Sequence, residues 1–250
     1  MKIFAIGDLH LSGTTPKPMD IFGDNWKNHR DKIESNWHSR IGDADLVLLP
    51  GDISWAMTIE EAIPDLQWIE SLPGKKVMIR GNHDFWWRSL AQVKQAVGPS
   101  LHLIQNNSVT FDGVAVAGTR LWQDGQLNFN RHIRWQSREE LGLPPEKENS
   151  LDDEGILQRE LNRLKLSLES VSSRARKIIV MLHFPPTDFS FRETRAVTLM
   201  QKYGVDACVF GHLHSLIPER LPRFPVQKWG IRLYLASSDV IDFNPVEIKI

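Results

Sequence analysis

Short apolar runs that alternate with helical patterns constrain the fold of this chain most strongly. Eight runs of four to six residues are rich in β-branched side chains, and most are continuously apolar, as expected for strands buried on both faces. They cover residues 2–6, 46–49, 75–79, 114–117, 177–182, 207–210, 231–236 and 246–250. Strands that alternate with helices predict a layered α/β domain.

Three segments between these runs have helical spacing. Trp26, Ile33 and Trp37 fall on one face of a helix predicted over 26–39. A second helix is predicted over 58–71, where Pro64 indicates a new first turn or a kink. The third covers about 151–175, and its apolar stripe predicts a helix packed on a sheet; the stripe consists of Leu157, Leu161, Leu164, Leu168 and Val171.

The chain has 250 residues, without an internal repeat, a low-complexity tract or a linker, so residues 1–250 are expected to form a single domain. Residues 119–150 are polar and contain Leu-Pro-Pro at 143–145. We expect this segment to be an insertion that caps the substrate site.

Composition disfavours several classes of protein. Thirty Lys and Arg residues oppose 31 Asp and Glu residues, and the resulting net charge of −1 disfavours a strongly basic nucleic-acid binder. No apolar run approaches the ~18 residues that a membrane span needs, and the apolar start is too short for a signal peptide. The single cysteine, Cys208, forbids an intrachain disulfide and fits a reducing compartment. We therefore expect a cytoplasmic protein without a membrane span. The sequence does not indicate its oligomeric state.

Polar residues that suit a metal ion follow five of the predicted strands. The carboxyl ends of strands in an α/β sheet form the ligand crevice, so these residues should meet at one rim. They are Asp8, His10, Asp52, Asn82, His183, His212 and His214. Glycines at 7, 51, 81 and 211 allow close backbone approach or unusual dihedral angles beside them.

This donor set combines oxygen and nitrogen without a thiolate, which suits Mn²⁺, Fe or Zn²⁺. Seven candidate ligands are too many for one tetrahedral ion. They suit two ions that share a bridging carboxylate, for which Asp52 is the best candidate. Two ions ~3.5–4 Å apart can bind a bridging hydroxide and clamp a phosphoryl group for in-line displacement.

The order of these motifs resembles the calcineurin-like metallophosphoesterases, and within them a bacterial group of predicted phosphohydrolases. The resemblance extends from residue 8 to residue 214 and rests on Asp8-x-His10, Gly51-Asp52, Gly81-Asn82-His83-Asp84, His183 and Gly211-His212-x-His214. It implies a four-layer α/β sandwich of two mixed β-sheets flanked by helices. It also implies two divalent metal ions, with manganese expected first and iron, zinc, cobalt or nickel as alternatives.

The resemblance also assigns roles to individual residues. One ion would be held by Asp8, His10, Asp52 and His214, and the second by Asp52, Asn82, His183 and His212. His83 would reach the substrate phosphate and assist the leaving group, with Asp84 orienting its imidazole. The remaining histidines for which we considered a role, His29, His38, His102 and His132, lie outside the pattern.

Three further residues are candidates for contact with substrate. Arg120 follows the strand predicted over 114–117 and would bind an anionic substrate. Trp55 and Trp86 follow the second and third motifs, where they either wall the substrate pocket or pack under the loops. Arg80 is expected to have a packing or surface role, and Cys208 to be an inert thiol of the core.

These features predict a metal-dependent phosphohydrolase that cleaves a small phosphodiester or phosphomonoester, with nucleotides among the candidate substrates. Ser/Thr protein phosphatases of this superfamily continue the second motif with Asp-Arg-Gly, whereas Gly51-Asp52 is followed here by Ile53-Ser54-Trp55. Two alternatives remain: a nuclease, which would bind nucleic acid with a steep salt dependence, and a non-catalytic interaction scaffold on the same fold.

Overall fold

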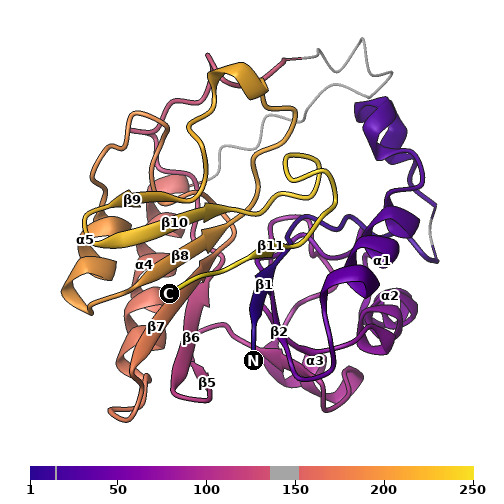
Figure 1. Ribbon diagram of the computed structural model, residues 1–250, viewed down its shortest axis with the longest axis horizontal. Coiled ribbons are helices and arrows are strands. Elements are labelled where there is room, and N and C mark those ends of the chain that lie inside the picture. Colours follow the sequence, from indigo (N-terminus) through magenta and orange to yellow (C-terminus); the bar gives the residue numbers. More distant parts are fainter. Residues whose placement is uncertain (15, 136–151) are drawn as a thin grey trace.

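Two mixed β-sheets lie face to face in the computed structural model, which describes residues 1–14, 16–135 and 152–250 (Figure 1). The first sheet has the order β11-β1-β2-β3-β4. Its strands are β1 (Ile3–Ala5), β2 (Leu46–Leu49), β3 (Lys75–Met78), β4 (Leu101–Leu103) and β11 (Val246–Glu247). Strands β1 to β4 are parallel, and β11 runs antiparallel at the edge.

The second sheet has the order β5-β6-β7-β8-β10-β9. Its strands are β5 (Val109–Phe111), β6 (Val114–Thr119), β7 (Lys177–Leu182), β8 (Ala207–Phe210), β9 (Val226–Lys228) and β10 (Ile231–Leu235). The four central strands are parallel, and the two edge strands pair antiparallel. The predicted sandwich of two mixed sheets is therefore confirmed.

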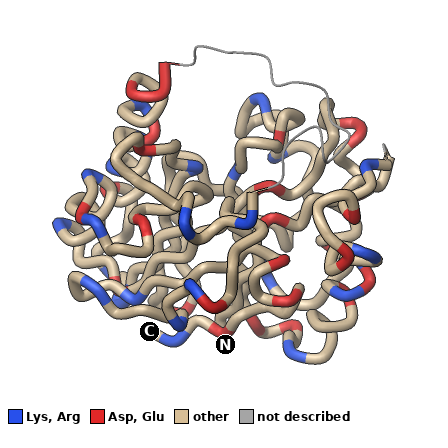
Figure 2. The backbone as a smooth tube through the Cα atoms, turned by 90° about the horizontal axis from the view of Figure 1, so that it is seen from above, with Lys and Arg blue, Asp and Glu red and all other residues tan. Residues whose placement is uncertain are grey.

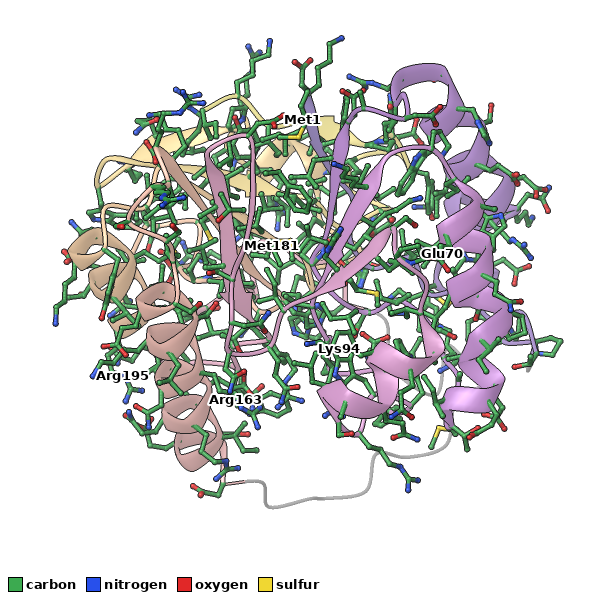
Figure 3. All side chains as sticks on the ribbon, turned by 90° about the horizontal axis from the view of Figure 1, so that it is seen from below. Met1, Glu70, Lys94, Arg163, Met181 and Arg195 are labelled. Atoms are coloured by element: carbon green, nitrogen blue, oxygen red, sulfur yellow. The ribbon has the colours of Figure 1, made fainter. Side chains whose placement is uncertain are left out.

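Helices cover the outer faces of both sheets. The first sheet packs against α1 (His29–Arg40), α2 (Ile59–Ser71) and α3 (Leu90–Ala96), and the second against α4 (Asp153–Glu169) and α5 (Arg195–Lys202). Figure 3 shows the four layers from below, with Met181 between the sheets, Glu70 and Lys94 on one outer layer, and Arg163 and Arg195 on the other. Short 3₁₀ helices cover Met19–Phe22, Asp24–Trp26 and Pro218–Arg220.

Three apolar clusters hold these layers together. One joins the first sheet to α1, α2 and α3 through residues such as Ile33 and Leu66. A second joins the other sheet to α4 and α5 through residues such as Leu164 and Val197. The third lies between the two sheets, where both faces of the central strands are buried. This burial explains why those strands read as continuous apolar runs.

The predicted elements agree with the structure except at their ends and in the shortest elements. The helix predicted over 26–39 begins at His29, because Asn28 has a left-handed φ of 54° and Trp26 belongs to a 3₁₀ turn. The helix predicted over 151–175 starts at Asp153, where the Asp152 side chain accepts a hydrogen bond from the Gly155 N–H, and ends at Glu169. Elements β4, β5, β9, α3 and α5 were not predicted.

Pro64 lies inside α2, which continues without interruption from Ile59 to Ser71. Of the two alternatives for Pro64, a new first turn is therefore wrong, and a kink within the helix stays a prediction. Proline has no backbone N–H, so the carbonyl of Glu60, four residues earlier, loses its helical hydrogen bond. Glu60 is exposed, and water can bond to this carbonyl instead. A capping box between Thr58 and Glu61 fixes the start of the helix.

Charge is distributed over both halves of the molecule. Figure 2 shows acidic and basic residues interspersed along the chain on both sides. In the described ranges, no helix is both long and apolar enough to cross a membrane.

The first part of the expected insertion, residues 119–135, is described, whereas 136–151 lies outside the described residues. Residues 132–134 pair with the chain after β8. Ile133 and Leu216 form an antiparallel bridge, the Arg134 N–H donates to the Ser215 carbonyl at 2.8 Å, and the Ile217 N–H donates to the His132 carbonyl at 2.8 Å. This part of the insertion is thus fixed to the loop that carries His212 and His214.

Candidate metal centre

The parallel strands of both sheets end at one edge of the sandwich, and the seven predicted ligands lie in the loops that follow. Asp8 and His10 follow β1, Asp52 follows β2, and Asn82 follows β3. His183 follows β7, and His212 and His214 follow β8. The structure brings all seven together, because the parallel pairing of β1 to β3 and of β7 with β8 aligns their carboxyl ends.

Four of these side chains form the first group: Asp8, His10, Asp52 and His214. The Nε2 atoms of His10 and His214 lie 3.2 Å apart. The His214 Nε2 is 3.7 Å from Asp8 Oδ1, and the His10 Nε2 is 3.8 Å from Asp52 Oδ2. The donor atoms of two carboxylates and two imidazoles therefore converge on one position.

The second group consists of Asp52, Asn82, His183 and His212. Asn82 Oδ1 lies 2.6 Å from His183 Nε2 and 3.0 Å from His212 Nδ1. The same two histidine nitrogens are 3.3 Å apart, and His183 Nε2 is 3.5 Å from Asp52 Oδ2. Asp52 Oδ2 thus faces both groups, which is the position of a bridging ligand.

These spacings suit metal coordination. Donors about 2.1 Å from a shared ion lie about 3 to 3.5 Å from one another. The imidazole–imidazole and imidazole–carboxylate distances of 3.2 to 3.8 Å are close to that range, and most are too long for good hydrogen bonds. Asp8, His10 and His214 offer donor atoms within 4.8 Å of one another, as do Asp8, Asp52 and His183. The residues therefore fit two divalent ions.

Two imidazoles are oriented by hydrogen bonds from the nitrogen that faces away from the centre. His183 Nδ1 lies 3.0 Å from the Pro50 carbonyl, so it is the donor and Nε2 is left as a lone-pair atom. His214 Nδ1 lies 2.8 Å from Asp239 Oδ1. The second oxygen of Asp239 accepts the Ser215 N–H at 2.9 Å. Sequence reasoning missed Asp239, although it follows β10 as the predicted ligands follow their own strands.

The backbone at the centre has unusual dihedral angles at the ligands themselves. Asp8, His10, Asp52 and His212 have φ values of 56°, 46°, 52° and 70°. Non-glycine residues rarely adopt this left-handed region, and each instance costs about 1 to 3 kcal/mol.

The expected close approach at the glycines is also present. A Cβ on Gly81 would lie 2.1 Å from Asp52 Oδ1, and one on Gly211 would lie 2.4 Å from Asp8 Oδ2.

Burial sets the protonation of the centre. It raises the pKa of Asp8 to about 7 and also raises the pKa of Asp52, because a buried carboxylate loses its hydration. Burial lowers the pKa of His10, His183 and His212, so each offers a neutral lone pair. His214 behaves differently. Burial lowers its pKa, but the carboxylates of Asp239 and Asp8 outweigh this effect and raise it to about 9.

His83 lies at the rim of the centre. Its backbone N–H donates to Asp52 Oδ1 at 2.8 Å, and its ring lies 4.5 Å from Trp55 and 5.8 Å from His10 between centroids. Burial lowers the pKa of His83, with Asp52 acting in the opposite direction. A neutral imidazole at this position offers one N–H donor rather than a full positive charge.

Asp84 has a different role from the expected one. Its fully buried carboxylate accepts the N–H groups of Ile53 at 2.8 Å, Ser54 at 3.1 Å and Gly81 at 2.7 Å, and the Trp86 Nε1–H at 3.1 Å. Within the described ranges it makes no hydrogen bond to the imidazole of His83. The expectation that Asp84 orients this imidazole is therefore wrong. Its bonds instead tie the loop after β2 to the loop after β3.

The two tryptophans differ in exposure. Trp86 is fully buried, so the expectation that it walls the substrate pocket is wrong and its alternative, packing under the loop, holds. Trp55 is half-buried and stacks on the ring of His10 at 4.9 Å between centroids. The Lys17 ammonium lies 2.9 Å from the Trp55 ring centroid. Trp55 therefore supports a predicted ligand directly.

Arg120 lies next to the second group. Its carbonyl accepts the N–H groups of His183 at 3.1 Å and Phe184 at 3.0 Å, and its charge lowers the pKa of Asp52 and of His183. Its guanidinium lies 4.4 Å from the Trp122 ring centroid and 3.5 Å from the buried carboxylate of Glu160. The Arg120 Nε–H is buried and has no hydrogen-bond partner among the described residues.

The remaining residues considered for a role lie outside both groups. Arg80 donates from Nε to the Asp84 carbonyl at 3.2 Å, which fits the expected packing role. Cys208 is buried in β8, and burial raises the pKa of its thiol. The four histidines expected outside the pattern, His29, His38, His102 and His132, belong to neither group.

Comparison with known proteins identifies the family. Residues 1–216 match the family model of calcineurin-like phosphoesterases. A segment of 77 residues is 35% identical to the Gene 66 protein of Mycobacterium phage L5, and it spans 31% of this chain and 37% of that relative. A protein of unknown function from Aquifex aeolicus superposes with a TM-score of 0.49 at 13% identity, over 98% of this chain and 95% of the other. A protein from Thermus thermophilus superposes with a TM-score of 0.46 at 14% identity, over 99% of this chain and 98% of the other. On the family-model match, which covers most of its length, the chain belongs to the calcineurin-like phosphoesterases.

Proposed function

We propose that this protein is a two-metal phosphohydrolase that cleaves a small phosphodiester or phosphomonoester. One observation carries the proposal: Asp52 Oδ2 faces His10 of the first group at 3.8 Å and His183 of the second group at 3.5 Å. A carboxylate shared by two donor groups is the arrangement that places two ions side by side. Manganese is the first candidate metal, and iron, zinc, cobalt and nickel are the alternatives.

When bound, two divalent ions supply Lewis-acid stabilisation of the phosphoryl oxygens and lower the pKa of the attacking water. Asp8, His10, Asp52 and His214 would hold one ion, and Asp52, Asn82, His183 and His212 the other. His83 is placed to donate an N–H to the leaving oxygen as negative charge develops there. Asp84 fixes the loop that carries Asn82 and His83, and is a positioning residue.

Arg120 is the proposed anchor for the substrate phosphate. Three features support this role: its position beside His183, the electrostatic effect of its charge on Asp52, and an Nε–H without a partner among the described residues. Arg120→Ala should raise KM about tenfold, because a charged hydrogen bond contributes about 1.5 to 3 kcal/mol. Unchanged KM and kcat would contradict the anchoring role.

The whole chain, 1–250, is proposed to act as one domain in which the segment around 119–150 caps the site. Support comes from the contacts of residues 132–134 with 215–217, which fix the described part of this segment to the loop of His212 and His214.

The test is reconstitution of metal-stripped protein with Mn²⁺, Fe²⁺, Zn²⁺, Co²⁺, Ni²⁺ or Mg²⁺ in separate samples. Each sample is assayed with bis-p-nitrophenyl phosphate and p-nitrophenyl phosphate, and its bound metal is counted. Turnover that accompanies about two ions per chain is expected. Full occupancy without turnover of either ester would favour a scaffold, and turnover with one bound ion would contradict the two-metal centre.

A further inference from the structure

A cavity of about 510 Å³ lies beside the second group. Its walls come from four parts of the chain: nine residues between Gln123 and Trp135, Asp153 at the start of α4, Phe184 with Pro185, and His212 with Leu213. Its volume falls within the range of about 300 to 1,000 Å³ that is typical of small-molecule sites.

The cavity shares a wall with the metal centre. His212 lines it and also directs Nδ1 toward Asn82 Oδ1 at 3.0 Å. The ring of Phe184 lies 4.0 Å from the ring of His212 between centroids. A group bound in the cavity would therefore lie against His212, a predicted ligand of the second group.

The wall formed by the insertion is held in place rather than lying loosely over the opening. The bridge between Ile133 and Leu216 and the hydrogen bonds of residues 132–134 fix one end. At the other end, Asp153 accepts hydrogen bonds from Trp122 Nε1 at 2.9 Å and Gln123 Nε2 at 2.5 Å. A prearranged cavity binds a ligand at a smaller cost in conformational entropy.

The lining indicates the charge of the group that fits. Among the described residues, no Lys or Arg lines the cavity, whereas the carboxylates of Asp124 and Asp153 do. A second phosphate or a carboxylate would be repelled there. The anionic part of a substrate would instead be drawn to the two ions and Arg120.

The lining also indicates shape and polarity. Phe129 and Trp135 contribute rings, and the ring of Trp135 is 67% exposed. Asn128 and Asn130 contribute amides. The Asn128 Oδ1 accepts the Asn130 backbone N–H at 2.9 Å, so Asn128 offers its NH₂ group as a donor, whereas the Asn130 amide can both donate and accept. Aromatic rings beside such amides suit a flat heterocycle, because it stacks on its faces and forms hydrogen bonds along its edges.

We propose that this cavity binds a neutral nucleoside-like group that stays attached to the phosphate during cleavage. The inference rests on the proposed function. The retained group is the better candidate because His83, which serves the leaving group, follows β3 of the first sheet. Phe184 and His212 follow strands of the second sheet. The proposed substrate is a phosphodiester with a nucleoside on one side.

The test compares two diesters that release the same p-nitrophenolate. Thymidine 5′-(p-nitrophenyl phosphate) retains a nucleoside, and methyl p-nitrophenyl phosphate retains a methyl group. We expect the metal-loaded protein to have a KM at least about tenfold lower for the thymidine ester, because its base can stack on the aromatic lining of the cavity. Asn128→Ala and Trp135→Ala should each raise that KM about tenfold and leave the KM of the methyl ester within about twofold.

Matched controls are Asn162→Ala and Leu166→Ala, both exposed on α4 and away from the cavity. These variants should behave as the unmodified protein on both esters. Equal KM values for the two esters, or equal losses on both in the cavity variants, would overturn the nucleoside assignment.

Calorimetry with free thymidine separates this inference from the proposed function. If protein that holds two ions hydrolyses neither diester and does not hydrolyse p-nitrophenyl phosphate, the proposed function fails. Thymidine binding to that protein still tests the cavity. The site is supported if thymidine binding releases or absorbs heat with the unmodified protein and with Asn162→Ala but not with Asn128→Ala. The absence of a binding heat with the unmodified protein overturns it.

Discussion

The two ligand groups are held in place by different means. In the second group, His183 is fully buried and its Nδ1 donates to a backbone carbonyl, that of Pro50. In the first group, the side chain of His214 is 29% exposed and its Nδ1 bonds to a side-chain carboxylate, that of Asp239. One orienting partner is a neutral part of the backbone, and the other is a side-chain carboxylate that a substitution removes.

This difference predicts that the two ions of the proposed centre would bind with unequal affinity. Burial lowers the pKa of His183 well below its usual value and keeps the imidazole neutral, while the Pro50 carbonyl fixes its orientation. The carboxylates around His214 raise its pKa to about 9, so a proton competes with the metal for its ring. We infer that the ion of the first group binds more weakly and depends more on pH.

The largest expected effect comes from removing the residue that both groups share. Asp52→Asn keeps the size of the side chain but removes the charge that faces His10 and His183. We expect kcat to fall about 10³-fold or more, because each ion contributes several kcal/mol to the transition state. Metal counting should show fewer than two ions per chain. Retained turnover in the metal-replete variant would contradict the role of Asp52 as a shared ligand. The control is Asp43→Asn, because Asp43 is exposed in a distant loop.

Asp239→Asn tests the inequality of the groups directly. The amide cannot act as the charged partner of the His214 ring, so the affinity for the first-group ion should fall about 10- to 100-fold. The second ion should bind as before. Titration of metal-free protein with Mn²⁺ measures both steps. Loss of affinity in both binding steps would contradict the separation of the groups. The control is Asp242→Asn, because Asp242 is exposed nearby, and an equal loss of affinity in this variant would also contradict it.

The pH dependence of the metal-free protein sharpens the same comparison. Asp8 and His214 both bind protons more tightly when folded, with pKa values of about 7 and about 9. The free energy of unfolding should therefore fall as pH rises from about 4 to 7, because Asp8, and Asp84 with a pKa that burial also raises to about 7, must ionise in buried sites. It should fall again between about 6.5 and 9, where His214 loses its proton. Thermal unfolding in chelator at pH 7 and pH 9 measures the second fall, and Asp239→Asn should reduce it.

The smallest effect on activity is expected from Trp86→Phe. This change removes one of the four donors to Asp84 and some volume from the core, so the free energy of unfolding should fall by about 1 to 3 kcal/mol. KM should stay within about twofold, because Trp86 is fully buried. Denaturant unfolding and steady-state kinetics measure the two quantities. A selective rise in KM would restore Trp86 as a substrate contact.

The central strands were predictable from sequence because both of their faces are buried. Val47 and Leu48, for example, pack in opposite directions, so no polar residue interrupts the run. The edge strands β5 and β9 were missed because each has three residues and a largely exposed or half-exposed pattern. Helix α5 was missed because its eight residues are too few to establish a period.

The candidate site was predictable to the extent that its residues come in local motifs. Each predicted ligand lies within a few residues of a strand end. The order of the five motifs along the chain, which resembles that of the family, was enough to find all seven. The role of Asp84 was not predictable, because its partners Ile53 and Ser54 are about 30 residues away in sequence. Asp239 is 25 residues from His214, and only the fold brings its carboxylate to that ring.

The left-handed conformations of Asp8, His10, Asp52 and His212 have a consequence for protein engineering. A designer who transfers only the seven side chains to another α/β sheet would place them on loops that relax to ordinary dihedral angles. The donor atoms would then point away from one another. The transferable unit is the end of each strand with its following loop, including the glycines that admit Asp52 and Asp8. Libraries that randomise these loops should retain residues that tolerate positive φ at those four positions.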